Sequence, residues 1–152
     1  MSNILIADDD ELVASLASEA LIGAGHACGW VTDGEKALQT IEWRRPDLLL
    51  LDQEMPVMSG ATLLRKLRTS EQHYDLPVIM FTAMSGVRDE EQALYNGAQE
   101  YIRKPFTPDL LVRVVERVLF ARSLRPRHED LMSKLEQSAG IWRDPEATRR
   151  FV

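Results

Sequence analysis

The sequence predicts an α/β fold: a doubly wound, five-stranded parallel sheet with five helices, followed by a short C-terminal tail. Short apolar runs alternate with amphipathic stretches along the first 120 residues, and the series begins with an apolar run. Runs such as LLLL at 48–51 are apolar throughout, which is typical of parallel strands covered on both faces. Strands that alternate with helices are joined by right-handed crossovers, and the sheet is therefore expected to be parallel.

The five expected strands are short apolar runs at 3–7, 27–31, 48–51, 77–81 and 99–102, each read as buried. Between them, apolar side chains recur at helical spacing at 11–25, 34–43, 60–69 and 88–96. Asp10 precedes the first helix as an N-cap, and Gly25 and Gly97 follow helices where a left-handed residue is favoured. The sequence TPD at 107–109 opens the last helix, with proline in its first turn.

Composition excludes several classes of protein. The 152 residues are 45% hydrophobic and 28% charged, which matches one ordinary globular domain. Cys28 is the single cysteine, so the chain has no intrachain disulfide and no Cys-rich zinc site. No apolar run approaches the roughly 18 residues that cross a bilayer, and the first residues lack the basic region of a secretory signal. We therefore expect a cytoplasmic protein with no membrane partner.

The charge is unevenly distributed along the chain. Residues 1–120 hold 11 Lys and Arg against 19 Asp and Glu, a net charge of −8, whereas residues 121–152 hold 7 against 5, a net charge of +2. An acidic body argues against direct DNA binding, which usually needs a basic face. We expect one domain at 1–122 and a linker and tail at 123–152, in which about 128–141 has the pattern of a short helix.

Acidic residues follow two of the expected strands. Asp8, Asp9 and Asp10 come directly after the first strand, and Asp52 comes after the third. In an open α/β sheet, ligands bind beyond the carboxyl ends of the strands, where these carboxylates would converge. Like charges that lie so close disfavour simultaneous ionisation. Magnesium relieves this conflict, because it prefers oxygen ligands and binds through one or two carboxylates and phosphate oxygens.

Two further residues complete the expected site at the ends of the fourth and fifth strands. Thr82 offers a hydroxyl and Lys104 an ammonium group. Facing a metal-bound carboxylate, these groups form a pocket for a tetrahedral dianion. The best-placed nucleophile is then a carboxylate, and aspartyl phosphate is a covalent form of that chemistry. Asp10 fits a simpler role, since an acidic N-cap stabilises a helix.

The sequence resembles the receiver domain of two-component response regulators. The likeness covers residues 3 to about 121 and is carried by ILIADDDE, LLLLDQEMPVMSG, VIMFTA and GAQEYIRKPF. It implies the flavodoxin-like strand order 2-1-3-4-5, and the 30 residues beyond it leave no room for a recognisable output domain.

The resemblance assigns roles to the residues at the strand ends. Asp52 matches the phosphoacceptor. Asp8, Asp9, Asp52 and Glu54 match the family's magnesium ligands. In the family, the residues at the positions of Asp9 and Asp52 bind the ion directly, the residue at Asp8 binds mostly through water, and the residue at Glu54 binds through its backbone carbonyl.

Other positions match the family's phosphoryl contacts and switch. Thr82, Lys104 and the backbone N–H of Ala83 match groups that contact the phosphoryl group. Thr82 and Tyr101 match the pair that changes position on phosphorylation. The family also implies a cis peptide bond before Pro105.

The resemblance further implies a signalling module rather than an enzyme. A sensor histidine kinase or a phosphotransfer protein donates the phosphoryl group, the receiver promotes its own phosphorylation and dephosphorylation, and an unknown downstream protein reads the result. A second copy of this chain is a further expected partner, in a homodimer. Gln99 replaces an acidic residue that many DNA-binding members use for dimerisation, although Arg113 fits their pattern.

Two alternatives remain at this point. A phosphatase of the haloacid-dehalogenase type also uses Asp, Mg²⁺, Thr and Lys, and Asp8-x-Asp10 superficially matches its first motif. Leu12 stands where that motif expects Thr or Val, however, and Asp52 would have no role. The other alternative is a receiver-like adaptor that acts without phosphorylation, whose usual sign is loss of the acidic pair, the acceptor Asp or the Lys.

Overall fold

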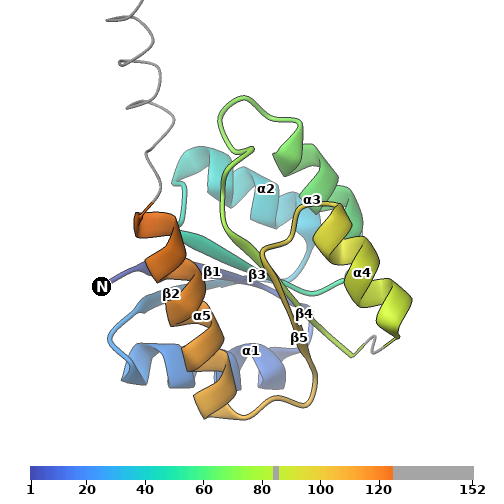
Figure 1. The fold of residues 1–152 in the computed structure, drawn as a ribbon. Coiled ribbons are helices and arrows are strands. Elements are labelled where there is room, and N and C mark those ends of the chain that lie inside the picture. Colours follow the sequence, from blue (N-terminus) through green and yellow to red (C-terminus); the bar gives the residue numbers. More distant parts are fainter. Residues whose placement is uncertain (84–85, 125–152) are drawn as a thin grey trace, which may run out of the picture. The chain divides into compact units, whose positions relative to one another are not determined.

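The computed structural model describes residues 1–83 and 86–124, so the predicted tail and its helix at 128–141 lie outside the described residues. Figure 1 shows a central sheet with helices on both of its faces. The strands are β1 (Asn3–Ala7), β2 (Ala27–Val31), β3 (Leu48–Leu51), β4 (Val78–Thr82) and β5 (Glu100–Arg103). The helices are α1 (Glu11–Gly23), α2 (Gly34–Trp43), α3 (Gly60–Arg68), α4 (Val87–Tyr95) and α5 (Pro108–Ser123).

The sheet has the order β2-β1-β3-β4-β5, and every pair of neighbouring strands is parallel. This confirms the predicted fold class. β1 pairs with β2 on one side and β3 on the other, and Ala7 lies opposite both Val31 and Leu51. The strand order therefore reverses next to β1, which is where open α/β sheets bind their ligands.

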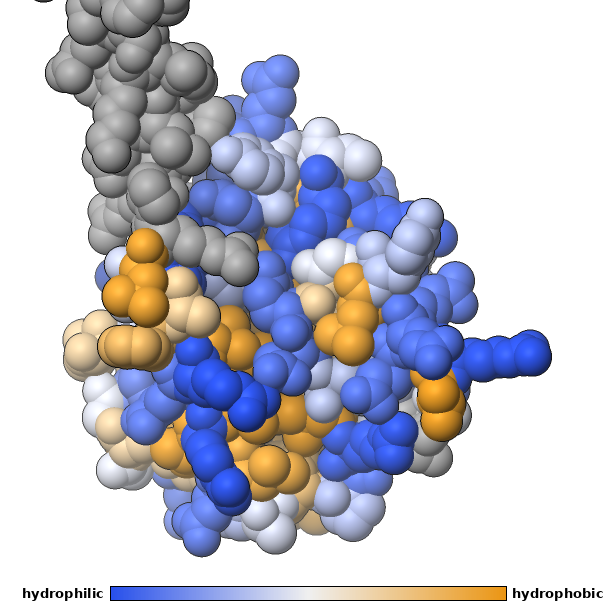
Figure 2. Space-filling view, in the orientation of Figure 1, coloured by the Kyte–Doolittle hydropathy of each residue, from blue (hydrophilic) through white to orange (hydrophobic). Residues whose placement is uncertain are grey.

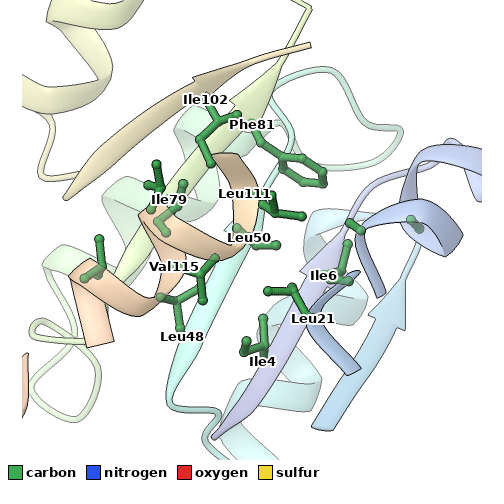
Figure 3. Packing of buried hydrophobic residues seen from close by; sticks show 14 residues of the cluster. Ile4, Ile6, Leu21, Leu48, Leu50, Ile79, Phe81, Ile102, Leu111 and Val115 are labelled. Carbon is green, nitrogen blue, oxygen red and sulfur yellow. The ribbon is translucent and has the colours of Figure 1, made fainter. Parts of the chain in front are cut away.

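Each face of the sheet has its own hydrophobic core. Alternate strand residues point to opposite faces, so the apolar run of β3 supplies both cores. One core packs strand residues against α1 and α5, as Figure 3 shows for Leu48, Leu50, Leu21, Leu111 and Val115. The other core holds Leu49 and Leu51 with residues of α2 and α3. Each fully buried leucine contributes roughly 1.5–3 kcal/mol to the free energy of unfolding.

The second strand differs from its prediction as a buried strand. β2 lies at the edge of the sheet, its residues are half-buried or exposed, and the Trp30 side chain is 42% exposed. An edge strand has a neighbour on one side only, which leaves part of its surface open to solvent. β4 and β5 also begin and end one residue later than predicted. Pro77, the predicted first residue of the fourth strand, lies just before β4, where its carbonyl accepts a hydrogen bond from Leu49 N.

The loop between β3 and α3 turns tightly over the end of β3. Gly60 starts α3 in contact with the main chain of Asp52, and a Cβ at this position would overlap the Asp52 carbonyl oxygen. Within the loop, Val57 has a φ of 68°, which is unfavourable for a β-branched side chain. This side chain is 76% exposed. Left-handed backbone costs roughly 1–2 kcal/mol for most L-residues, so this valine stores strain beside the carboxyl edge of the sheet.

No helix in residues 1–83 and 86–124 combines the length and the apolar character needed to span a membrane.

Replacing the strained valine should stabilise the fold. We expect Val57→Asn to raise the free energy of unfolding by about 1 kcal/mol, because asparagine adopts the left-handed conformation more readily. Urea denaturation would show this as a higher midpoint with an unchanged slope. Val57→Ile keeps the branched side chain and should give no gain. An equal rise in both variants would show that the backbone at position 57 is not the cause.

Candidate functional site at the carboxyl edge of the sheet

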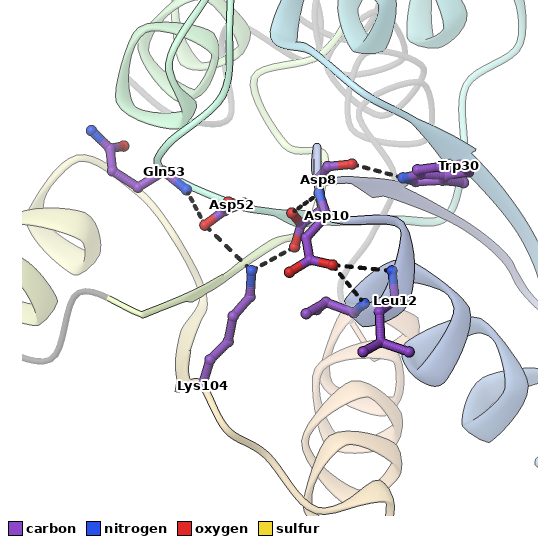
Figure 4. A network of polar contacts seen from close by, with 8 residues as sticks. Asp8, Asp10, Leu12, Trp30, Asp52, Gln53 and Lys104 are labelled. Carbon is purple, nitrogen blue, oxygen red and sulfur yellow. Dashed lines mark hydrogen bonds and ion pairs between the residues drawn. The ribbon is translucent and has the colours of Figure 1, made fainter.

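The structure brings the sequence-predicted residues together from four strands. Asp8 follows β1, Asp52 follows β3, Thr82 ends β4 and Lys104 follows β5. Figure 4 shows the Lys104 ammonium group pointing between the carboxylates of Asp8 and Asp52. Asp8, Asp52 and Thr82 are buried, with exposed fractions of 0%, 6% and 2%. The parallel arrangement of the strands places all four residues at one edge, because their carboxyl ends meet there.

Lys104 is held in place by both carboxylates and by an aromatic ring. Its Nζ lies 2.5 Å from Asp8 Oδ2 and 3.6 Å from Asp52 Oδ1. The same nitrogen lies 4.8 Å from the centre of the Phe81 ring, a cation–π contact. Lys104 N also donates to Thr82 O at 3.0 Å, and the Lys104–Pro105 bond is cis, as the resemblance implies.

Three carboxylates form a cluster that suits a divalent cation. Ligand oxygens of Asp8, Asp9 and Asp52 all lie within 4.8 Å of one another, and Asp9 is exposed while the other two are buried. With all three ionised, Lys104 balances only one of three negative charges. An oxygen-only donor set with an excess of negative charge is what Mg²⁺ prefers, so these residues fit that ion.

The environment of Asp52 disfavours its charged form. Burial raises the pKa of Asp52 above its ordinary value of 3.8, the nearby Lys104 lowers it, and the charge of Asp8 raises it again. Hydrogen bonds from the Thr82 hydroxyl and from Gln53 N, the latter at 2.9 Å, favour the charged carboxylate but do not outweigh burial. A neighbouring cation would remove this penalty.

The remaining predicted residues lie around this cluster. Ala83 directly follows Thr82 and is exposed, and Glu54 is exposed in the loop after Asp52. Tyr101 lies on β5 opposite Met80 and packs in part against the second core. Burial raises the pKa of its hydroxyl, and Asp89 adds to that rise. The switching role of Tyr101 stays a prediction.

The sequence does not single out two residues that support the site. Trp30 Nε1 donates to the main-chain oxygen of Asp8 at 2.7 Å. Gln53 Oε1 accepts from Ala61 N at 2.7 Å, which ties the residue after Asp52 to the start of α3. Gln53 could have been found from the sequence, because it directly follows Asp52. The contact of Trp30 could not, because it depends on how β2 pairs with β1.

Removing the charge of Asp52 should stabilise the metal-free protein. Its pKa is raised in the folded state, so the unfolded chain loses this proton at lower pH and the folded state is penalised at neutral pH. We expect Asp52→Asn to raise the melting temperature at pH 7. The gain should disappear as the pH falls below 3.8, where the carboxyl is neutral in both states. Melting curves across pH test this, and Glu19→Gln on the exposed surface of α1 is the control. A gain that does not depend on pH would exclude this cause.

Comparisons with known proteins agree with the geometry. The family model for the response regulator receiver domain matches residues 4–116. The phosphate regulon transcriptional regulatory protein PhoB of Pseudomonas aeruginosa is 40% identical over 116 residues, which are 76% of this chain and 51% of PhoB. The dual master transcriptional regulator RpaA of Synechocystis is 34% identical over 88% of this chain and 57% of its own length. The chain thus spans about half the length of these curated relatives.

Solved structures show the same fold. The crystal structure of a putative response regulator from Chloroflexus aurantiacus has a TM-score of 0.75 and 36% identity over 78% of this chain and 97% of its own. The receiver domain of NtrX from Brucella abortus has a TM-score of 0.71 and 33% identity over 76% of this chain and 97% of its own. The chain therefore belongs to the response regulator receiver domain family, the signalling domains of two-component systems.

Proposed function

We propose that Asp52 accepts a phosphoryl group from a sensor histidine kinase or a phosphotransfer protein, in a reaction that depends on Mg²⁺. The observation that carries the proposal is the convergence of three carboxylates and one lysine at the carboxyl edge of the sheet. This arrangement offers a nucleophile, oxygen ligands for a cation and a positive charge for the incoming dianion. Family membership supports the same chemistry.

The chemistry at Asp52 is an in-line transfer. A carboxylate oxygen of Asp52 attacks the phosphorus atom, an O–P bond forms, and the N–P bond to the donor histidine breaks with its electrons leaving on the imidazole. Asp9, Asp52 and the carbonyl of Glu54 would hold Mg²⁺, with Asp8 acting mostly through water. When bound, Mg²⁺ offsets the charge on the phosphoryl oxygens. The domain in this way promotes its own phosphorylation and, with water as the nucleophile, its dephosphorylation.

Lys104 and Thr82 are the side chains that would donate hydrogen bonds to the new phosphoryl group. Lys104 Nζ already lies 3.6 Å from Asp52 Oδ1, and the Thr82 hydroxyl already bonds the same carboxylate. The Ala83 N–H would supply a further donor. Hydrogen bonds to a dianion are charge-assisted and strong, so several of them supply the roughly 5 kcal/mol that moves a two-state equilibrium from off to on.

The proposed output is a changed protein-binding surface on α4, β5 and α5. Displacement of Thr82 would free space for the Tyr101 ring on the neighbouring strand. This surface carries exposed apolar side chains on α4, with Val87 66% and Tyr95 90% exposed. It also carries the ion pair between Arg103 and Glu90 at 2.8 Å. Figure 2 shows hydrophilic residues with scattered apolar ones on the side where these elements lie. Such a surface, which mixes apolar side chains with charges of both signs, suits a downstream protein better than DNA.

Phosphorylation is tested directly by intact-mass measurement. With Mg²⁺ and acetyl phosphate, the native chain should gain the mass of one phosphoryl group, and Asp52→Asn should gain none. Asp47→Asn is a matched control, because Asp47 lies just before the other end of β3 and is exposed. It should be phosphorylated like the native chain. A native chain without any mass gain, or a gain retained in Asp52→Asn, would contradict the proposal.

Cation binding should stabilise the folded state. At a Mg²⁺ concentration one hundred times the dissociation constant, the free energy of unfolding should rise by about 2.7 kcal/mol. Asp9 is exposed, so Asp9→Asn should fold normally yet lose most of this gain. Thermal unfolding with and without Mg²⁺ measures both effects. An Asp9→Asn protein that gains as much as the native chain would remove Asp9 from the ligand set.

A further inference from the structure

We propose that Trp30 is a positioning residue for the acidic cluster: its indole N–H fixes the main chain of Asp8, and the affinity of the cluster for Mg²⁺ depends on that bond. The inference rests on the proposed function, because it assigns a supporting residue to the same site. Trp30 belongs to the edge strand β2 and contributes no ligand atom of its own.

The register of β1 and β2 explains why a side chain is needed here. Ala7 lies opposite Val31, the last residue of β2, so Asp8 extends one residue beyond the paired strands. Asp8 N still donates to Val31 O at 3.1 Å. The Asp8 carbonyl accepts from Trp30 Nε1 at 2.7 Å. The indole therefore continues the hydrogen-bonding ladder past the end of β2. Together, the Val31 carbonyl and the indole N–H hold both polar groups of the Asp8 main chain against this strand.

The contacts of the Asp8 side chain carry this restraint into the site. Asp8 Oδ1 accepts from Asp10 N at 2.9 Å, and Asp8 Oδ2 contacts Lys104 Nζ at 2.5 Å. Asp9, the exposed member of the cluster, lies between Asp8 and Asp10 in the chain. A shift of the Asp8 main chain would consequently displace one ligand directly and Lys104 through its ion pair. Figure 4 shows the chain of contacts from Trp30 through Asp8 to Lys104.

Packing alone does not account for a tryptophan at this position. Trp30 is 42% exposed on an edge strand, so a large part of its ring contacts solvent rather than the core. The same residue nevertheless donates a 2.7 Å hydrogen bond from its indole N–H to the main chain, which indicates that the N–H group contributes to its placement. Residues that orient the ligands of a metal often change its affinity by 10-fold to 100-fold when they are replaced.

The test removes the N–H group and leaves an aromatic ring. We expect Trp30→Phe to raise the Mg²⁺ dissociation constant, measured by calorimetry, about tenfold. Replacement of Trp30 by 3-benzothienylalanine, which has the size of tryptophan but no N–H, should weaken binding to a similar extent. Trp43→Phe makes the same chemical change at the end of α2, where the ring is 83% exposed, and should leave the affinity unchanged.

A second measurement needs no metal. In the metal-free protein, Trp30→Phe should speed amide hydrogen exchange at Asp10, whose N–H bonds to Asp8, whereas Trp43→Phe should not. Native affinity in both Trp30 replacements would overturn the inference, as would unchanged exchange at Asp10. A native chain that binds no Mg²⁺ would instead overturn the proposed function, and with it the claim that Trp30 supports a cation site.

Discussion

The repulsion among three neighbouring carboxylates is the constraint on which the rest of the structure depends. Isolated carboxylates would avoid one another in water, yet Asp8 and Asp52 are buried with Asp9 beside them. The fold keeps them together because each follows a strand that is anchored in two hydrophobic cores. Lys104 balances part of their charge, and the remaining imbalance provides the attraction for a cation. Burial in the fold disfavours the charged form of Asp52, which is the form that the proposed phosphoryl transfer would need.

Much of the fold and of the candidate site could be predicted because both follow from local sequence. The apolar runs mark the strands, and Asp8, Asp52, Thr82 and Lys104 each stand at or directly after a strand end. The partial exposure of β2 could not be read from its residues, since it depends on the strand being at the edge. The contact of Trp30 with Asp8 depends on strand register, and the left-handed backbone at Val57 runs against the preference of its side chain.

Several residues fix the main chain of the loop that follows Asp52, each by a different contact. Gln53 N bonds the Asp52 carboxylate, while the Gln53 side chain accepts from Ala61 N at the start of α3. Gly60 allows α3 to begin against the main chain of Asp52. The loop that follows Asp52 is thus fixed at both ends, and the strain at Val57 lies between these points. A frame of this kind holds the Asp52 carboxylate in place, and under the proposed function it would do so while groups on β4 and β5 move.

The ion pair between Asp8 and Lys104 joins residues that are 96 positions apart in the sequence. During synthesis the first strand leaves the ribosome long before the last, and domains generally fold as units once their chain is available. The lysine that balances the carboxylates after β1 and β3 arrives only with β5, the last strand in the sequence. The ion pair between Asp8 and Lys104 consequently requires the first and the last strand of the sheet to be present together.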